Sequence, residues 1–287
     1  MDNRRSLAAG RPVAVAIVKY AVLIALLAFI VAPFLFMLTA AFMSARDIIA
    51  MPYRWIPKSL YTQNFAKAIA GNDRSYLFFR SFLNSLIVAS VVTVTTMFIA
   101  SLTGYSLSKF TFPGRDVVFM LIMATMMIPF EAIMIPLQVV STQLRLTNTF
   151  AGLILPFLVE AFGIFLMRQY FVTFPDEFID AARVDGMGEF SIYRKILLPN
   201  AGAAIATLAI LTFRNQWDSL MWPLLVVQSE HMKTLPLYIM KFTGDINSDE
   251  GSQMAVSLLA SIPMLVLFFS MSKYFISGGI LHASRKG

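Results

Sequence analysis

The sequence predicts an all-α polytopic membrane protein with six transmembrane helices. Of its 287 residues, 58% are hydrophobic and only 14% are charged, whereas soluble domains average about 45–50% apolar and about 25% charged residues. The mean hydropathy is +0.72. Six apolar runs also approach or exceed the ~20 residues that a helix needs to cross a bilayer.

The first apolar run extends from residue 20 to about residue 42 and follows a basic segment, residues 1–18. It is longer than the apolar region of a signal peptide, so we interpret it as a membrane helix. The other runs cover about 84–106, 117–140, 150–171, 201–228 and 252–272. Pro129 and Pro136 predict a kink in the third run. We expect residues 19–272 to form one six-helix transmembrane domain, with tails at residues 1–18 and 273–287.

An even number of spans places both termini on the same side of the membrane. With the termini in the cytoplasm, the cytoplasmic segments hold 13 Lys and Arg residues and the outer segments hold nine. This bias follows the positive-inside rule, although the first outer loop, residues 43–80, alone holds six. On this weak bias we expect a multi-pass membrane protein with both termini cytoplasmic.

Composition excludes several kinds of chemistry. The chain has no cysteine, and its two histidines, His231 and His282, are far apart in sequence. Disulfides, thiolate metal sites and a histidine-based metal or catalytic cluster are therefore not expected. No GxxxxGK[ST] stretch is present, so we expect no ATP site in this chain. The net charge of +7 is explained by basic residues that flank membrane spans, and we expect no nucleic-acid partner.

A charged segment of about 25 residues separates the fourth and fifth predicted spans. Its first half predicts a helix in which Phe178, Ala181 and Ala182 share one face. On the other side, Asp180 and Arg183 are spaced to form an ion pair at i, i+3. A segment this polar in such an apolar chain is expected to meet water or a protein partner.

The second half of this segment predicts a turn and another short helix. Gly186 and Gly188 end the first helix, because glycine adopts the left-handed conformation at low cost. The second helix places Phe190, Tyr193 and Leu197 on one side.

This segment resembles the EAA loop of ABC-importer membrane subunits, in which E-A-A is followed by three residues, G, nine residues and I-x-L-P. The matching residues keep both spacings: Asp180, Ala181, Ala182, Gly186, Ile196, Leu198 and Pro199. The chain departs from the pattern in having Asp180 in place of Glu. The resemblance implies that residues 175–199 form a cytoplasmic coupling helix that docks into a cleft of an ATPase subunit.

Two further segments are similar to the carbohydrate-importer permeases. Residues 213–225 read FRNQWDSLMWPLL and match the Trp and Trp-Pro positions of a family segment, with Asp218 in place of Asn. The C-terminus, with Lys286 and Gly287, is similar to the closing segment of the shorter maltose-type permease. This resemblance implies an ABC type I importer fold in a bacterial plasma (inner) membrane, with residues 19–272 as its permease domain. In the maltose-type family the tail approaches the ATPase, and the alternative for residues 282–287 is a disordered basic tail.

The resemblance also implies the partners of the chain. They are a second permease subunit, an ABC ATPase dimer that binds ATP and Mg, and a periplasmic or extracellular solute-binding protein. Membrane lipid and a small-molecule solute complete the set. No cofactor, metal or catalytic residue is expected in this chain itself.

Polar and aromatic residues inside the predicted spans are candidates for contact with the solute. Charges in spans are costly and face protein or water, and sugars are bound by planar hydrogen-bonding groups together with aromatic faces. The candidates are Glu131, Glu160, Arg214, Asn215, Trp217, Asp218 and Trp222. Arg214 and Asp218 are spaced to pair at i, i+4. The alternative is that these groups hold the helices together.

The predicted function is that of a permease subunit of a binding-protein-dependent ABC importer. With a second permease, it forms an alternating-access pathway for a sugar or related polyol. It is coupled through the EAA loop to a separate ATPase. The alternative is a stand-alone ion-coupled secondary transporter that uses Glu131, Glu160 or Asp218 as ion sites. Such folds often contain internal repeats, and no repeat is visible here.

Overall fold

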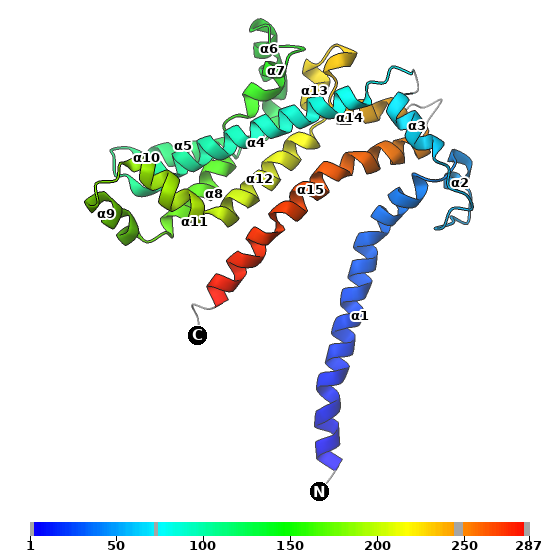
Figure 1. The fold of residues 1–287 in the computed structure, drawn as a ribbon, viewed down its shortest axis with the longest axis horizontal. Helices are drawn as coiled ribbons and strands as arrows, with labels where there is room; N and C mark the ends of the chain where they lie inside the picture. Colours follow the sequence, from blue (N-terminus) through cyan, green and yellow to red (C-terminus); the bar gives the residue numbers. More distant parts are fainter. Residues whose placement is uncertain (1–2, 72–73, 244–248, 284–287) are drawn as a thin grey trace. The chain divides into compact units, whose positions relative to one another are not determined.

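The computed structural model describes residues 3–71, 74–243 and 249–283, and all regular structure in these ranges is helical (Figure 1). The predicted all-α class is therefore confirmed. The longer helices are α1 (Asn3–Ala40), α4 (Phe78–Lys109), α5 (Arg115–Thr125), α6 (Phe130–Gln143), α8 (Ala161–Val172), α12 (Gly202–Trp217) and α15 (Glu250–Ala283). The shorter α-helices are α2 (Ala45–Ile49), α3 (Gln63–Ala70), α7 (Phe150–Ile154), α9 (Asp176–Val184), α10 (Glu189–Ile192), α11 (Leu198–Asn200), α13 (Met221–Val226) and α14 (Leu235–Ile239).

Three helices of the described chain are long and apolar enough to cross a membrane. They are α1 over Val15–Ala40, α4, and α15 over Glu250–Tyr274. Three bent helix pairs also meet this test: α5 with α6, the segment 150–157 with α8, and the segment 189–200 with α12. The described part of the chain thus contains up to six spans if each bent pair is counted as one.

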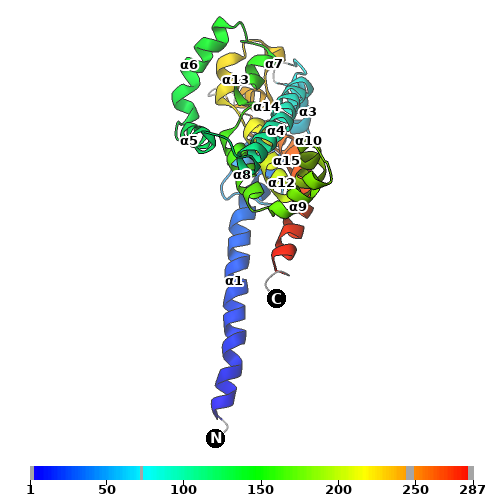
Figure 2. The same ribbon diagram turned by 90° about the vertical axis from the view of Figure 1, so that its left-hand side faces the viewer.

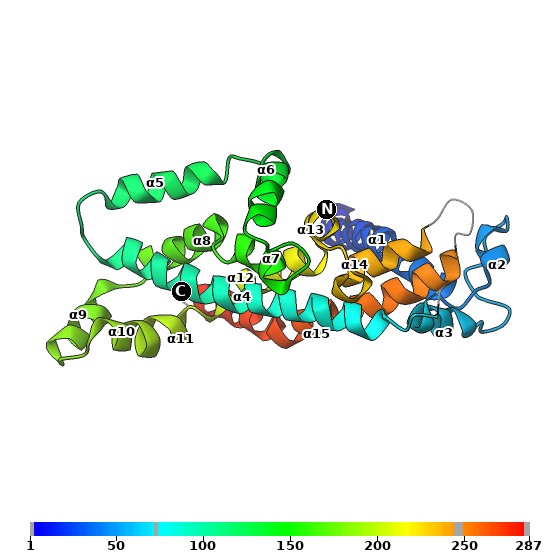
Figure 3. The ribbon, with the colours of Figure 1, turned by 90° about the horizontal axis from the view of Figure 1, so that it is seen from above.

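The sharpest bend separates α5 from α6, at an angle of 94° (Figure 3). It occurs at residues 126–129, and Pro129 directly precedes α6. A proline disfavours the α conformation of the residue before it, so Ile128 cannot continue α5. The kink predicted from Pro129 is confirmed, whereas Pro136 lies inside α6 without ending it.

Both predicted tails are partly helical. Helix α1 begins at Asn3 and runs without a break to Ala40 (Figure 2), so it includes most of the predicted tail of residues 1–18. Helix α15 continues beyond the predicted end of the sixth span to Ala283. Lys286 and Gly287, which carry the C-terminal resemblance, lie outside the described residues.

The chain divides into two compact units, and the predicted permease domain of residues 19–272 includes parts of both. The first unit comprises residues 1–75 and 242–259. Within it, the buried Asn64 amide donates hydrogen bonds to the carbonyl oxygens of Ala41 (3.0 Å) and Met43 (2.7 Å). Lys67 and Asp249 form an ion pair at 2.8 Å. These contacts join the end of α1, α3 and the start of α15.

The second unit comprises residues 76–241 and 260–287, and α4 is its central helix, packed against α8 and α12. Small residues permit this packing. A Cβ atom at Gly104 of α4 would lie 2.8 Å from both the backbone nitrogen of Arg168 and the Cβ of Met167 in α8. Small residues at contact points let helix backbones approach closely in membranes.

We therefore expect Gly104→Ala to destabilise the protein by about 1–3 kcal/mol, the usual cost of overpacking. The neighbouring atoms are backbone atoms of α8 and the Cβ of Met167, which is attached directly to that backbone, so none of them can move aside as the end of a flexible side chain would. Gly188→Ala is the matched control, because a Cβ at Gly188 meets no atom within 4 Å. Thermal unfolding of both variants in detergent checks the prediction, and equal unfolding temperatures would contradict it.

Candidate functional site: an exposed helix pair and a polar cavity

The predicted helix, turn and helix of residues 175–199 are confirmed. Pro175 is the N-cap residue of α9, and the helix itself begins at Asp176. Asp176 and Glu177 occupy its first turn, where negative charge favours the helix dipole. Gly186 follows α9 with φ of +80°, a conformation that glycine adopts without strain.

Helix α9 buries one side and exposes an apolar stripe on the other. Ile179 and Ala182 are buried, at 1% and 4% exposure. Phe178 and Val184 are 61% and 88% exposed, and Ala181 between them is also exposed. The predicted grouping of Phe178, Ala181 and Ala182 is therefore divided between two sides of α9. An exposed apolar stripe bordered by charges is typical of a protein-contact surface.

The second short helix consists of α10, a π-helical turn over Tyr193–Leu197, and α11. Pro199 has no N–H to donate four residues back, which accounts for the local widening of the helix. Tyr193 and Leu197 are buried as expected from their shared face, but Phe190 is 58% exposed. The Phe190 ring still contacts Tyr193, at a centroid distance of 5.8 Å.

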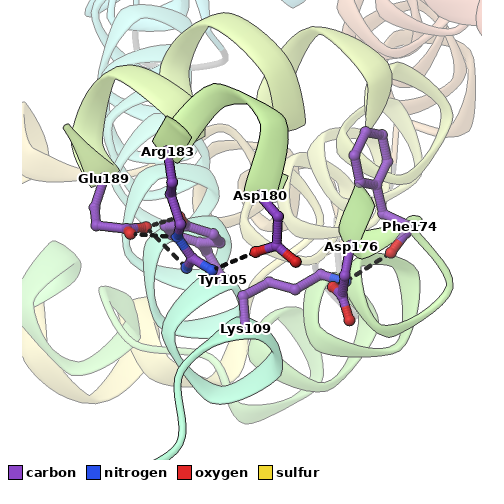
Figure 4. A network of polar contacts seen from close by, with 7 residues as sticks. All are labelled: Tyr105, Lys109, Phe174, Asp176, Asp180, Arg183 and Glu189. Atoms are coloured by element: carbon purple, nitrogen blue, oxygen red, sulfur yellow. Dashed lines mark hydrogen bonds and ion pairs between the residues drawn. The ribbon is translucent and has the colours of Figure 1, made fainter. Parts of the chain in front are cut away.

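A polar network attaches these helices to α4 (Figure 4). The Tyr105 hydroxyl of α4 donates a hydrogen bond to Glu189 Oε2. Arg183 of α9 donates from Nε to Glu189 Oε1 at 2.8 Å and pairs with Asp180 at 3.1 Å. The predicted pair of Asp180 and Arg183 is thus confirmed, and Arg183 also joins α9 to α10.

A second attachment lies at the C-terminal end of α4. The Lys109 ammonium donates to the Phe174 carbonyl oxygen at 2.6 Å and to Asp176 Oδ1. The Lys109 side chain is only 4% exposed, whereas that of Asp176 is 72% exposed. Lys109 thus ties α4 to the start of α9, and Tyr105 ties α4 to Glu189 of α10. Deeper in the unit, the hydroxyls of Ser101 and Tyr193 are hydrogen-bonded at 2.7 Å.

The electrostatics of the network favour its ionised form. The hydrogen bond from Arg183 is the main cause that holds the pKa of the Glu189 carboxyl below its usual value. Partial burial opposes this shift, and the Tyr105 hydroxyl adds to it. Glu189 therefore remains a hydrogen-bond acceptor for both partners at neutral pH.

A cavity of about 530 Å³ lies elsewhere in the second unit, and most of the predicted solute contacts line it. It is formed where α6, the break before α8 and the C-terminal end of α12 meet. Its predicted lining residues are Glu131, Glu160, Arg214, Asn215 and Asp218, and its other lining residues are Phe130, Pro156, Phe157, Val159, Thr212, Gln216 and Ser219.

Three charged residues of the lining contact another lining residue: Glu160, Arg214 and Asp218. Glu160 is the N-cap residue of α8, and its Oε2 accepts a hydrogen bond from the Thr212 hydroxyl of α12 at 2.8 Å. Arg214 Nε lies 3.5 Å from Asp218 Oδ2, which confirms the predicted i, i+4 pair. Among the described residues, no three His, Cys, Asp or Glu side chains converge on a possible metal position.

The structure does not bring the two predicted tryptophans into this cavity. Trp217 and Trp222 are 4% and 1% exposed. Their indole N–H groups donate to the carbonyl oxygens of Ala260 and Gly152, both at 3.0 Å. A buried indole usually has its N–H satisfied in this way. For these two residues, the geometry supports the alternative role in helix packing.

Several residues of both sites were not singled out from the sequence. Tyr105 and Lys109 stand among other polar residues at the end of a predicted span, with no local pattern to mark them. Thr212 has an ordinary membrane-helix sequence context. Phe130 and Phe157 form the aromatic walls of the cavity. Each directly follows a proline, Pro129 or Pro156, and this position at a helix break was the one feature of the sequence that could have indicated them.

Comparison with known proteins identifies the class of the chain. The family described as binding-protein-dependent transport system inner membrane component matches residues 96–278. The chain belongs to this family and is a membrane permease subunit rather than an enzyme. This membership favours the ABC importer over the alternative of a secondary transporter.

Several curated relatives are similar over most of their length. The arabinooligosaccharides transport system permease protein AraQ of Bacillus subtilis (strain 168) is 34% identical, over 77% of this chain and 78% of its own. The lactose transport system permease protein LacG of Rhizobium radiobacter is 36% identical, over 69% and 72%. The sn-glycerol-3-phosphate transport system permease protein UgpE of Salmonella typhi is 32% identical, over 97% and 98%.

A solved structure confirms the fold. It is a crystal structure of a bacterial ABC transporter involved in the import of the acidic polysaccharide alginate. One of its chains superposes with a TM-score of 0.80, covering 91% of this chain and 96% of that one, at 24% sequence identity. The predicted ABC type I importer-like fold is therefore supported by a chain of an ABC importer.

Proposed function

We propose that this chain is the permease half of an importer for a sugar or related polyol and is coupled to a separate ATPase through α9. The exposed apolar stripe of Phe178, Ala181 and Val184 carries this proposal, because it lies on the helix that holds the EAA-like residues. An ATPase subunit that covers this stripe would remove it from water, which favours binding by the hydrophobic effect.

The network to α4 supports a mechanical role for α9. Tyr105 and Lys109 link the helix pair to the central helix of the second unit. A displacement of α9 by the ATPase is then transmitted to α4 as a rigid-body movement, which alternates the access of the pathway between the two sides. The partner ATPase dimer binds ATP and Mg, and this chain supplies no group to the hydrolysis.

The polar cavity is the proposed place of solute contact in this chain. Amide groups of Asn215 and Gln216 offer donors and acceptors for hydroxyl groups. The rings of Phe130 and Phe157 offer apolar faces for the C–H side of a sugar. Relatives named for arabinooligosaccharide, lactose and sn-glycerol-3-phosphate transport support this class of solute.

Membership of the family supports the remaining partners of the proposal. A second permease completes the pathway, and a periplasmic or extracellular solute-binding protein delivers the solute from outside. In this proposal the chain lies in a bacterial plasma membrane with both termini in the cytoplasm, so that α9 is on the side of the ATPase. The cytoplasmic bias of Lys and Arg supports this orientation.

Purification of the tagged chain from native membranes in mild detergent tests the proposal. We expect mass spectrometry to find a second permease and an ATPase, and we expect the purified complex to hydrolyse ATP. Addition of the solute-binding protein should stimulate this hydrolysis in proteoliposomes. Recovery of the chain alone, with transport intact in proteoliposomes lacking ATP, would contradict the proposal.

A further inference from the structure

More negative than positive groups line the cavity. Three carboxylates line it, those of Glu131, Glu160 and Asp218, against the single guanidinium of Arg214. The formal charge of the lining is therefore −2. The other lining side chains are uncharged.

The single positive charge of the lining, on Arg214, is already paired with a carboxylate. Arg214 lies 3.5 Å from Asp218 on the same helix. The described residues place no basic side chain within ion-pair distance of Glu131 or Glu160. The hydroxyl of Thr212 orients Glu160 through a hydrogen bond but brings no charge. The excess negative charge thus belongs to Glu131 and Glu160.

We propose that this cavity selects neutral or basic sugars and discriminates against anionic ones, such as uronates and sugar phosphates. This inference rests on the proposed function, which makes the cavity part of the solute pathway. A cleft lined by one sign of charge between low-dielectric walls concentrates ions of the opposite sign and repels the others. A neutral sugar donates its hydroxyl groups to the carboxylates in charge-assisted hydrogen bonds, and an ammonium group pairs with them directly.

The relatives do not decide this question, because they are named for both neutral and anionic solutes, lactose and sn-glycerol-3-phosphate among them. The superposed structure belongs to a transporter of an acidic polysaccharide. The charge of the cavity in this chain is therefore a property that its own residues determine.

The absence of cysteine from the sequence permits a direct measurement of the cavity's electrostatic potential. Ser219 lines the cavity, and Ser219→Cys places a thiol there with little change in volume. Cationic and anionic methanethiosulfonate reagents are applied to the assembled complex, and each rate at this thiol is divided by the rate with free 2-mercaptoethanol. We expect the cationic reagent to be favoured by about tenfold or more.

Charge-neutralising variants, each in the Ser219→Cys background, give predictions of opposite sign. Glu131→Gln and Glu160→Gln should each lower the ratio of cationic to anionic rates, whereas Arg214→Gln should raise it. Asp116→Asn is the matched control, since this exposed carboxylate at the start of α5 does not line the cavity, and the ratio should not change. A ratio of one or below, or a ratio unaffected by either glutamate variant, would overturn the proposal.

A separate readout tests whether the cavity belongs to the pathway at all. Alternating access requires that the reactivity of the Ser219→Cys thiol toward a neutral reagent differ between the nucleotide-free complex and the complex trapped with ATP and vanadate. An unchanged rate would remove the cavity from the pathway and refute this part of the proposed function, whatever the charge ratio. A changed rate with a ratio of one or below would refute only the charge selectivity.

Discussion

Replacing Ala181 with tryptophan should strongly weaken the association of this chain with its ATPase while leaving the permease folded. Ala181 lies at the centre of the exposed stripe of α9, between Phe178 and Val184. An indole at this position stands away from the protein core, so the fold has no reason to change. It would, however, prevent a second surface from approaching the helix. Central interface positions commonly account for 2–4 kcal/mol, so we expect association to weaken by about 100-fold.

Co-purification of the ATPase with the tagged chain measures this effect, and ATP hydrolysis by the recovered material measures its consequence. Ala181→Ser is the matched control, because it preserves the small volume at the same position. Ala182→Trp is a different kind of change: Ala182 is 4% exposed, so its replacement should unfold the helix pair. Normal recovery of the ATPase with Ala181→Trp would show that the stripe is not the docking surface.

Replacing Lys109 with methionine should uncouple the ATPase from the permease without releasing it. The substitution keeps the apolar length of the side chain but removes the ammonium that binds Phe174 and Asp176. The carbonyl of Phe174 then loses its donor, at a cost of about 1–3 kcal/mol. Because α4 is no longer tied to the start of α9, stimulation of ATP hydrolysis by the solute-binding protein should fall by about fivefold to a hundredfold.

The matched control is Lys58→Met, which removes an exposed lysine in the predicted outer loop. The same variants should still recover the ATPase by co-purification, which separates uncoupling from loss of docking. A double-mutant cycle of Tyr105→Phe and Glu189→Gln, read by the same stimulation, tests the other attachment. Full stimulation in Lys109→Met would show that α9 acts on the spans through other contacts.

The sequence predicted one of the bends between helices better than another. Pro129 marked the bend between α5 and α6, because the effect of proline on its neighbours is local and visible in one dimension. The 80° bend between residues 189–200 and α12 had only Pro199 and the preceding charges as signals. The buried face of α9 was also not predicted. Phe178 and Ile179 are adjacent apolar residues, and periodicity alone did not decide that Ile179 would be buried and Phe178 exposed.

The two tryptophans show the limit of reasoning from composition. Trp217 and Trp222 stand beside Arg214, Asn215 and Asp218, and this clustering of aromatic and polar groups is typical of sugar sites. Their burial depends on partners 43 and 70 residues away in the sequence, the carbonyls of Ala260 and Gly152. No local sequence pattern contains those partners. In the structure, Phe130 and Phe157 line the cavity in place of the two tryptophans.

The sequence by itself determined the class of the protein and the position of the segment that we propose couples it to an ATPase, because hydropathy and a spaced local motif are properties of neighbouring residues. The tertiary structure decided which charged groups share one cavity. Glu131, Glu160 and Arg214 come from three different segments, and they line one cavity only because tertiary packing brings α6, the start of α8 and the end of α12 together. It also decided which groups join α9 to α4, because hydrogen bonds between distant segments form only where packing places a donor beside an acceptor.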